Sequence, residues 1–311
     1  KSSDFLKRTF LGYHRDNGAV GTENNWLIIP LVFCQNRNVE ILKKTMLDKF
    51  GYEKSVKDTY NIDELVHKYN SGASENELLE LDLIKSSHIN KNKPLFSNVD
   101  GIYFLTHDGG CGGSTSDAVT LCNLLAGYIN NPNIAGATVL SLGCQHAQIK
   151  LVEKALKRIA PNTKKPIYFL EQQQSKSEPE FLADAIKKTF TGLIQANKVS
   201  RAPAPLNKLT LGLECGGSDG FSGISANPTL GYVSDIIVGL GGSAILSEFP
   251  ELNGVEQELI NRCVDIDKAQ KFAEIMEAYN TKATALGAGF HANPSPGNIK
   301  DGLITDAIKS A

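Results

Sequence analysis

Short apolar runs alternate with Gly-rich polar loops and with longer segments whose apolar residues recur three or four positions apart. Apolar runs closed by Gly or Asp predict buried strands, and the longer period predicts helices. The expected strands cover 26–33, 101–107, 137–143, 166–171, 209–213 and 243–248. The expected helices cover 38–50, 62–69, 76–85, 147–159, 178–196, 251–263 and 266–286, with others after Ser114 and from Asn227. Such repeated strand–loop–helix units predict an α/β fold of mostly parallel, open sheets in two lobes, with a boundary near 160–165.

Composition and charge narrow the class of protein. Hydrophobic residues make up 41% and charged residues 21% of the 311 residues, as in ordinary globular proteins. The formal net charge of -2 gives no reason to expect nucleic acid or an anionic membrane as a partner. No apolar run is long enough to span a bilayer, and the first residues lack the pattern of a signal peptide. The six cysteines form no CxxC pair, which favours a reducing, cytoplasmic compartment.

Reactive side chains follow the last apolar residue of strand after strand. The carboxyl ends of parallel strands share one edge of a sheet, so groups far apart in sequence can converge there. Chance alone does not often place three of six cysteines at such ends. The side chains concerned are His107 and Cys111, then Cys144 and His146, then Gln172, then Glu214, Cys215 and Asp219, and finally Glu248.

Metal-assisted proton abstraction is one chemistry that these groups support. Histidine, cysteine and carboxylate side chains bind borderline divalent ions such as Fe(II) or Zn(II), which stabilise the enediolate formed next to a carboxylate. The candidates for base and acid are His107, His146, Glu248 and His291. Two alternatives stay open for the cysteines: an iron–sulfur cluster on Cys111, Cys144 and Cys215, or simple burial in the core, where Cys34, Cys122 and Cys263 are also expected.

Two further function classes fit parts of the sequence. Gly216 to Gly220 satisfies the G-x-S-x-G pattern of a serine hydrolase, with Ser218 as the nucleophile, His291 as the base and Asp265 or Asp267 as the acid. A non-catalytic binder of sugars or anions would use the backbone of the Gly-rich turns at 109–113 and 216–223. Such a binder leaves the His, Cys and Glu positions unexplained.

Several motifs resemble those of the altronate/galactarate dehydratase family, which also includes the large subunit of sulfolactate sulfo-lyase. They are GYHRDNGAVGTENN (12–25), THDGGCGG (106–113), AGYINNPNIAGATVLSLGCQ (126–145), LGLECGGSDGFSGISANPTLG (211–231), LSEFPELNGVE (246–256) and NPSPGN (293–298). The resemblance implies a lyase that removes water from a sugar acid to give a 2-keto-3-deoxy product, usually with Fe(II) or another divalent metal. It also implies a middle domain over 1–150 and the start of a carboxyl-terminal domain over 160–311.

The chain departs from the family pattern at three places. A small SAF domain, fused or present as a separate subunit in the family, is absent here, and family members continue well beyond NPSPGN. We therefore expect a truncated chain, active only with its missing parts. Position 23 is Glu where the family commonly has Arg, which leaves Arg15 as the nearby candidate for holding a substrate carboxylate.

The two lines of reasoning combine into one mechanistic hypothesis. A divalent metal near His107, Cys111, Cys144 and Cys215 polarises the substrate carboxylate. Histidine 107 or 146 removes the α-proton, and Glu248 or His291 protonates the leaving hydroxide. The substrate-binding set is Arg15, Gln172, Ser218, Asp219, Ser222 and Asn227. The alternatives are a sulfolactate sulfo-lyase large subunit and a non-catalytic sugar-acid-binding fragment. We expect a homo-oligomer that binds a small sugar acid. A separate SAF-domain subunit is a further candidate partner.

Overall fold

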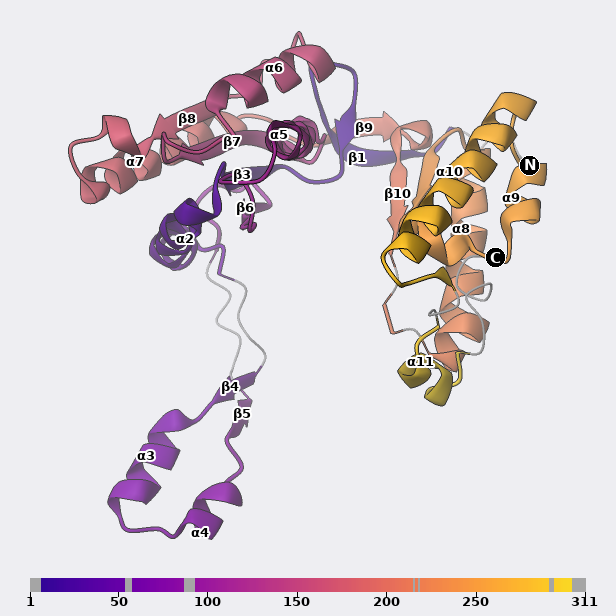
Figure 1. Ribbon diagram of the computed structural model, residues 1–311. Coiled ribbons are helices and arrows are strands. Elements are labelled where there is room, and N and C mark those ends of the chain that lie inside the picture. Colours follow the sequence, from indigo (N-terminus) through magenta and orange to yellow (C-terminus); the bar gives the residue numbers. More distant parts are fainter. Residues whose placement is uncertain are drawn as a thin grey trace. The chain divides into compact units, whose positions relative to one another are not determined.

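The computed structural model describes residues 7–53, 58–86, 93–214, 216–217, 219–290 and 294–303 (Figure 1). It divides into two compact units, one of Leu11–Ala202 and one of the described residues among 1–10 and 203–311. The expected boundary near 160–165, and with it the division into 1–150 and 160–311, falls inside the first unit. The reason is that the strand after this point joins the same sheet as the strands before it.

A four-stranded parallel sheet forms the centre of the Leu11–Ala202 unit. Its spatial order is β6-β3-β7-β8. Leu27 on β3 pairs with Tyr103 on one side and with Ala137 on the other. The strands are β3 (Asn25–Pro30), β6 (Gly101–Phe104), β7 (Ile134–Ser141) and β8 (Ile167–Glu171). The predicted parallel α/β architecture is therefore confirmed.

Helices cover both faces of this sheet because side chains on a strand alternate between its faces. Trp26 and Ile28 pack with one pair of helices, α2 (Asn36–Phe50) and α7 (Glu178–Ala196). Leu27 and Ile29 pack with the other pair, α5 (Thr115–Asn130) and α6 (Ile149–Ile159). Every residue of β3 and β7 is buried, which explains their nearly continuous apolar sequences.

Trp26 is fully buried between a strand and a helix that carry glycine at the contact. A Cβ atom added at Gly136 would lie 2.5 Å from Cζ3 of the indole, and one added at Gly192 would lie 2.0 Å from Cη2. The indole Nε1 donates to Thr138 Oγ1 over 3.1 Å, and this hydroxyl lies 2.7 Å from that of Thr189. The sheet and α7 thus approach closely enough to exclude any side chain larger than glycine.

Two parts of this unit contain strands that hydrophobic periodicity did not predict. Residues 9–21 contain an antiparallel pair, β1 (Thr9–His14) and β2 (Val20–Gly21). Between α2 and β6 the chain makes an excursion with a second antiparallel pair, β4 (Asp58–Tyr60) and β5 (Ile84–Ser86), and helices α3 (Ile62–Asn70) and α4 (Glu75–Leu79). No side chain in 60–84 is buried. The excursion begins and ends at neighbouring points, since the Leu95 N–H donates to the Phe50 carbonyl over 3.0 Å.

The second unit contains a separate two-stranded parallel sheet. Strands β10 (Thr210–Leu213) and β11 (Ser243–Leu246) pair in register from Thr210 to Leu213, so the six expected strands do not share one sheet. The remaining elements are β9 (Ala202–Pro205), α8 (Asn227–Gly239), α9 (Glu256–Asn261), α10 (Ile266–Ala285) and α11 (Pro296–Lys300). No helix in the described ranges is long and apolar enough to cross a bilayer.

Candidate active site

The loops that leave the carboxyl ends of the four-stranded sheet depart in opposite directions. The chain after β3 runs to α2 on one face, whereas the chain after the adjacent β7 runs to α6 on the other. In open parallel sheets, such a switch point opens a crevice outside the strand ends where ligands bind. Of the residues expected at this edge, the structure brings together His107, Cys111, Cys144, His146 and Gln172, because all lie in loops after β6, β7 and β8.

The His107 ring links the loop after β6 to the end of β3. Its Nε2 lies 2.8 Å from the Pro30 carbonyl, and its Nδ1 lies 3.2 Å from the Gly109 N–H. These partners assign the proton to Nε2, which donates to Pro30, and the lone pair to Nδ1. The Asn36 amide also donates to the His107 carbonyl over 3.0 Å. In this arrangement His107 takes a proton or a metal ion only by giving up one of its two ring hydrogen bonds.

The Gly-rich loop after β6 contacts the loop after β7 through its backbone. The Gly110 carbonyl accepts hydrogen bonds from the N–H groups of His146 (3.0 Å) and Ala147 (3.1 Å). Gly110 has a φ of 98°, and a Cβ atom there would lie 2.1 Å from the Leu31 carbonyl oxygen, so no other residue fits. The loop thereby fixes the backbone of His146, whose side chain is exposed. This imidazole is free of side-chain hydrogen bonds among the described residues.

Amide side chains gather beside the loop after β8. The Gln35 Nε2 donates to Gln172 Oε1, which also accepts from Asn38 Nδ2 over 3.2 Å. Asn38 Nδ2 also donates to Gln35 Oε1 over 2.8 Å. Gln35 and Asn38 are both buried. The buried oxygens Asn36 Oδ1 and Asn38 Oδ1 lack a hydrogen-bond partner in the described structure.

Three exposed thiols come from the same edge, those of Cys34, Cys111 and Cys144. The expectation that Cys34 belongs to the core is wrong, because it lies in the short turn after β3 and not on the buried face of α2. Cys122 is buried, as expected, and its burial raises the pKa of its thiol to about 11.

The expected metal ligands are thiols and an imidazole, a donor set that suits Fe(II) or Zn(II). Among the described residues, however, no three His, Cys, Asp or Glu side chains lie close enough together to hold a metal ion. His107 also has both ring nitrogens engaged. His107, Cys111 and Cys144 therefore do not form a preformed metal site by themselves, and the fourth expected ligand, Cys215, lies outside the described residues.

Apart from Arg15, the other expected residues belong to the second unit. Asp219 Oδ1 accepts from the Ser222 N–H over 2.7 Å, and the Ser222 hydroxyl donates back to the Asp219 carbonyl over 2.7 Å. This reciprocal pair begins the helical segment that continues into α8 at Asn227. Glu248 is exposed and has a φ of 57°, a conformation that is costly for residues other than glycine. Cys215, Ser218 and His291 lie outside the described residues.

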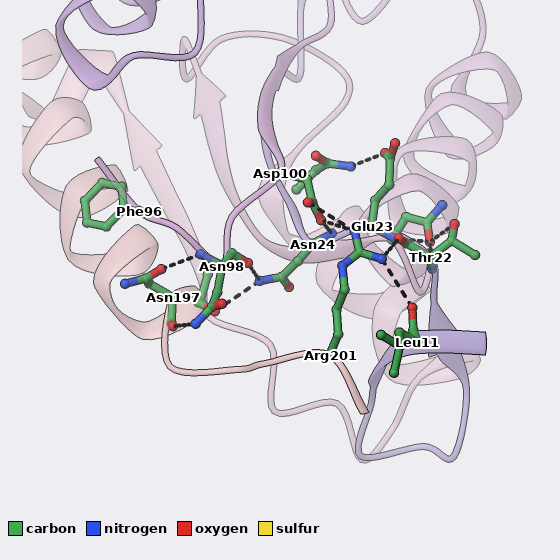
Figure 2. Close-up of polar contacts among 12 residues, drawn as sticks. Leu11, Thr22, Glu23, Asn24, Phe96, Asn98, Asp100, Asn197 and Arg201 are labelled. Carbon is green, nitrogen blue, oxygen red and sulfur yellow. Dashed lines mark hydrogen bonds and ion pairs between the residues drawn. The ribbon is translucent and has the colours of Figure 1, made fainter. Parts of the chain in front are cut away.

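Arg15 lies at the opposite, amino edge of the four-stranded sheet. Its Nε donates to the Pro132 carbonyl over 2.7 Å, in the loop that leads into β7. The rest of the 12–25 motif contacts the same edge, where Arg201 donates to the carbonyls of Thr22 (2.7 Å) and Leu11 (3.3 Å) and pairs with Asp100 over 3.1 Å (Figure 2). Glu23 Oε2 accepts from Asn25 Nδ2 over 2.6 Å, a role that an arginine cannot fill. Arg15 is therefore not among the groups gathered at the carboxyl edge.

Sequence reasoning did not select Cys34, Gln35, Asn36 or Asn38. They follow an apolar strand, as the selected residues do, but the predicted strand extended to Phe33 and the polar segment after it opens a helix. The strand in fact ends at Pro30. Applying the strand-end criterion to this first strand as well would have included them.

Comparison with known proteins identifies the family. Residues 12–197 match the model for "D-galactarate dehydratase/Altronate hydrolase, second domain", and residues 206–311 match "D-galactarate/Altronate dehydratase, C-terminal". The altronate dehydratases of Bacillus subtilis and Escherichia coli are 31% and 29% identical over 97% and 96% of this chain, which spans 51% and 50% of their lengths. Subunit beta of (2R)-sulfolactate sulfo-lyase from Chromohalobacter salexigens is 26% identical over 96% of this chain and 62% of its own. The chain thus belongs to the D-galactarate/altronate dehydratase family and spans about half the length of the altronate dehydratases that it matches.

Proposed function

We propose that this chain forms part of a lyase that removes water from a sugar acid of the altronate or galactarate type. The family assignment supports the class of reaction. The observation that carries the placement is the switch point at the carboxyl edge of the four-stranded sheet, where the loops that contain His107, His146 and Gln172 begin. The amide side chains of Gln35, Asn38 and Gln172 make this edge polar, which suits a polyhydroxylated acid better than an apolar ligand.

His146 is the proposed base. The Gly110 carbonyl holds its backbone in place, while its side chain is exposed. The imidazole is therefore well positioned and accessible to a substrate. In the proposed reaction this ring takes the proton from the carbon next to the substrate carboxylate. The electron pair that stays on carbon forms the C2–C3 double bond as the C3–O bond breaks and hydroxide leaves with a proton. The resulting enol tautomerises to a 2-keto-3-deoxy acid.

A divalent metal is a separate part of the proposal. The expected Fe(II) or other ion would stabilise the negative charge that develops on the substrate carboxylate. Metal analysis of protein purified without oxygen tests this part, and a stoichiometric divalent ion retained with activity is the expected result. A fully active protein free of divalent metal would contradict it, and acid-labile sulfide would indicate the iron–sulfur alternative instead.

The reaction is tested by keto-acid release from altronate, galactarate and sulfolactate with the protein in its full natural length. The His146→Gln variant should lower kcat at least about 100-fold, as the loss of a general base commonly does. His67→Gln is the matched control, because His67 is an exposed histidine on α3. Full activity of His146→Gln would contradict the role of the base. Release of sulfite with pyruvate from sulfolactate would favour the sulfo-lyase alternative that the relationship to subunit beta suggests.

A further inference from the structure

A pocket of about 500 Å³ opens at the amino edge of the four-stranded sheet. It lies within the Leu11–Ala202 unit, between the β1–β2 turn, the ends of α6 and α7, and the loop that leads into β8. Its polar lining includes Arg15, Asp16, Asn162, Lys164 and Lys165. The carboxyl-edge loops that carry His107 and His146 lie at the other end of the same strands, so this pocket plays no part in the function proposed above.

Two basic residues that line this pocket bind neighbouring backbone carbonyls. Lys165 Nζ donates to the carbonyls of Ile129 (3.0 Å) and Asn131 (2.6 Å). Arg15 Nε donates to the next carbonyl along the chain, that of Pro132, over 2.7 Å, and its Nη2 donates to the Glu23 carbonyl over 3.3 Å. Because Asn131 and Pro132 are consecutive, the loop that follows α5 holds both positive charges at one place.

The backbone contacts do not account for both cations. The end of α5 gains a favourable charge from Lys165, which binds the carbonyl of Ile129 in the last turn. Arg15 binds carbonyls that lie outside any helix. Its positive charge is therefore not needed at the end of α5, which Lys165 already stabilises. In the described part of the chain, neither cation forms an ion pair with a carboxylate, and Asp16 in the lining is exposed.

The electrostatics of the pocket agree with this geometry. Burial and then the nearby charge of Arg15 lower the pKa of Lys165 to about 7, and burial lowers the pKa of Arg15 against the smaller, opposite effects of Tyr13 and Asp16. Both cations also keep donors in reserve. The guanidinium carries five N–H groups and the ammonium three, and the four hydrogen bonds named above use two from each side chain. An anion placed between them would receive these donors and offset the repulsion.

We propose that this pocket binds a small oxyanion, a phosphate or carboxylate group, between Arg15 and Lys165. The inference is independent of the dehydratase proposal, because it rests on the amino edge alone. The volume of the pocket exceeds that of one such group, so the anion is expected to be the head of a small metabolite.

Titration of the full-length protein with inorganic phosphate, followed by isothermal calorimetry, tests the proposal. We expect saturable binding at one site, weakened at least tenfold in Asn162→Asp. This variant places a carboxylate in the pocket at an exposed position and leaves the Arg15 and Lys165 hydrogen bonds intact. Lys154→Met, which removes an exposed cation from α6 outside the pocket, is the matched control and should bind as the native protein does.

A second arm uses malonate, a small dicarboxylate, to separate the two kinds of oxyanion. Tighter binding of phosphate than of malonate assigns a phosphorylated ligand, and the reverse assigns a carboxylic acid. A Lys165→Arg variant, which keeps the charge, should bind, and Lys165→Met should not, with circular dichroism confirming that both fold. Absence of binding by both anions, or equal binding by native protein and Asn162→Asp, would overturn the proposal.

Discussion

Replacing Gly192 by alanine should destabilise the Leu11–Ala202 unit although alanine is the better helix former. The new methyl carbon would lie 2.0 Å from Cη2 of Trp26, whereas carbon atoms in contact prefer about 3.5–4.0 Å. The indole would have to move by about 1.5 Å to restore that contact distance. Gly136 lies against the same ring, which further restricts this movement.

The magnitude follows from two opposing effects. Alanine in place of glycine inside a helix gains about 1 kcal/mol. Overpacking a buried site costs about 1–3 kcal/mol, and the ring held between two backbones places this site at the upper end. We therefore expect the free energy of unfolding to fall by about 2 kcal/mol.

Urea unfolding followed by tryptophan fluorescence measures this change, since Trp26 is the one tryptophan of the chain. Gly127→Ala on α5 is the matched control, because no atom lies within 4 Å of the new carbon and the position is exposed. That variant should gain up to about 1 kcal/mol. If Gly192→Ala proved as stable as Gly127→Ala, the close approach of α7 to the sheet would be refuted. Adding Trp26→Phe to Gly192→Ala should recover part of the loss, as followed by circular dichroism.

Three further predictions concern other parts of the first unit. Arg201→Met should lower the free energy of unfolding by about 1–3 kcal/mol, because Arg201 binds two carbonyls as well as Asp100. The control Arg37→Met removes only an exposed ion pair at 3.8 Å and should change this free energy little, so equal effects of the two variants in urea unfolding would count against the role of Arg201. Iodoacetamide should alkylate Cys34, Cys111 and Cys144 in the native protein but Cys122 only after unfolding, since Cys122 is buried and burial raises the pKa of its thiol. Peptide mass spectrometry measures the labelling, and rapid labelling of Cys122 in the native protein would disprove the prediction. Folding lowers the pKa of Lys165 to about 7, so between that pH and about 10.4 the unfolded chain binds one more proton than the folded chain. The free energy of unfolding should therefore rise with pH over this range, by at most about 1.4 kcal/mol per pH unit. Lys165→Met should lack this rise, and an identical pH profile of stability in both proteins would exclude it.

Hydrophobic periodicity predicted the elements whose burial is regular. The helix expected over 178–196 is α7, which begins after Ser177, whose side chain accepts from the Glu180 N–H. The segment 26–33 predicted a buried strand, because β3 is covered on both faces and both faces must then be apolar. Helix ends and buried strands depend on residues that are close together in the sequence, so the local sequence pattern predicts them.

Long-range partners determined what the sequence did not predict. β1 and β2 are short, and the segment that contains them makes contacts with Arg201 and Pro132, which lie far away in sequence. The same holds for the candidate site. Its placement at the carboxyl edge follows from strand order, and five of the expected residues lie there. The engagement of His107 by Pro30 and the amide cluster around Gln172 depend on three-dimensional contacts that spacing alone does not reveal.

The excursion between Phe50 and Leu95 has a consequence for engineering this fold. Its two ends are joined by a backbone hydrogen bond of 3.0 Å, and none of the side chains in 60–84 contributes to a core. The four-stranded sheet therefore does not depend on the sequence of this segment. A short Gly-Ser turn could replace the segment, and a foreign reporter domain with closely spaced termini could be grafted at the same point, with the four parallel strands left as they are.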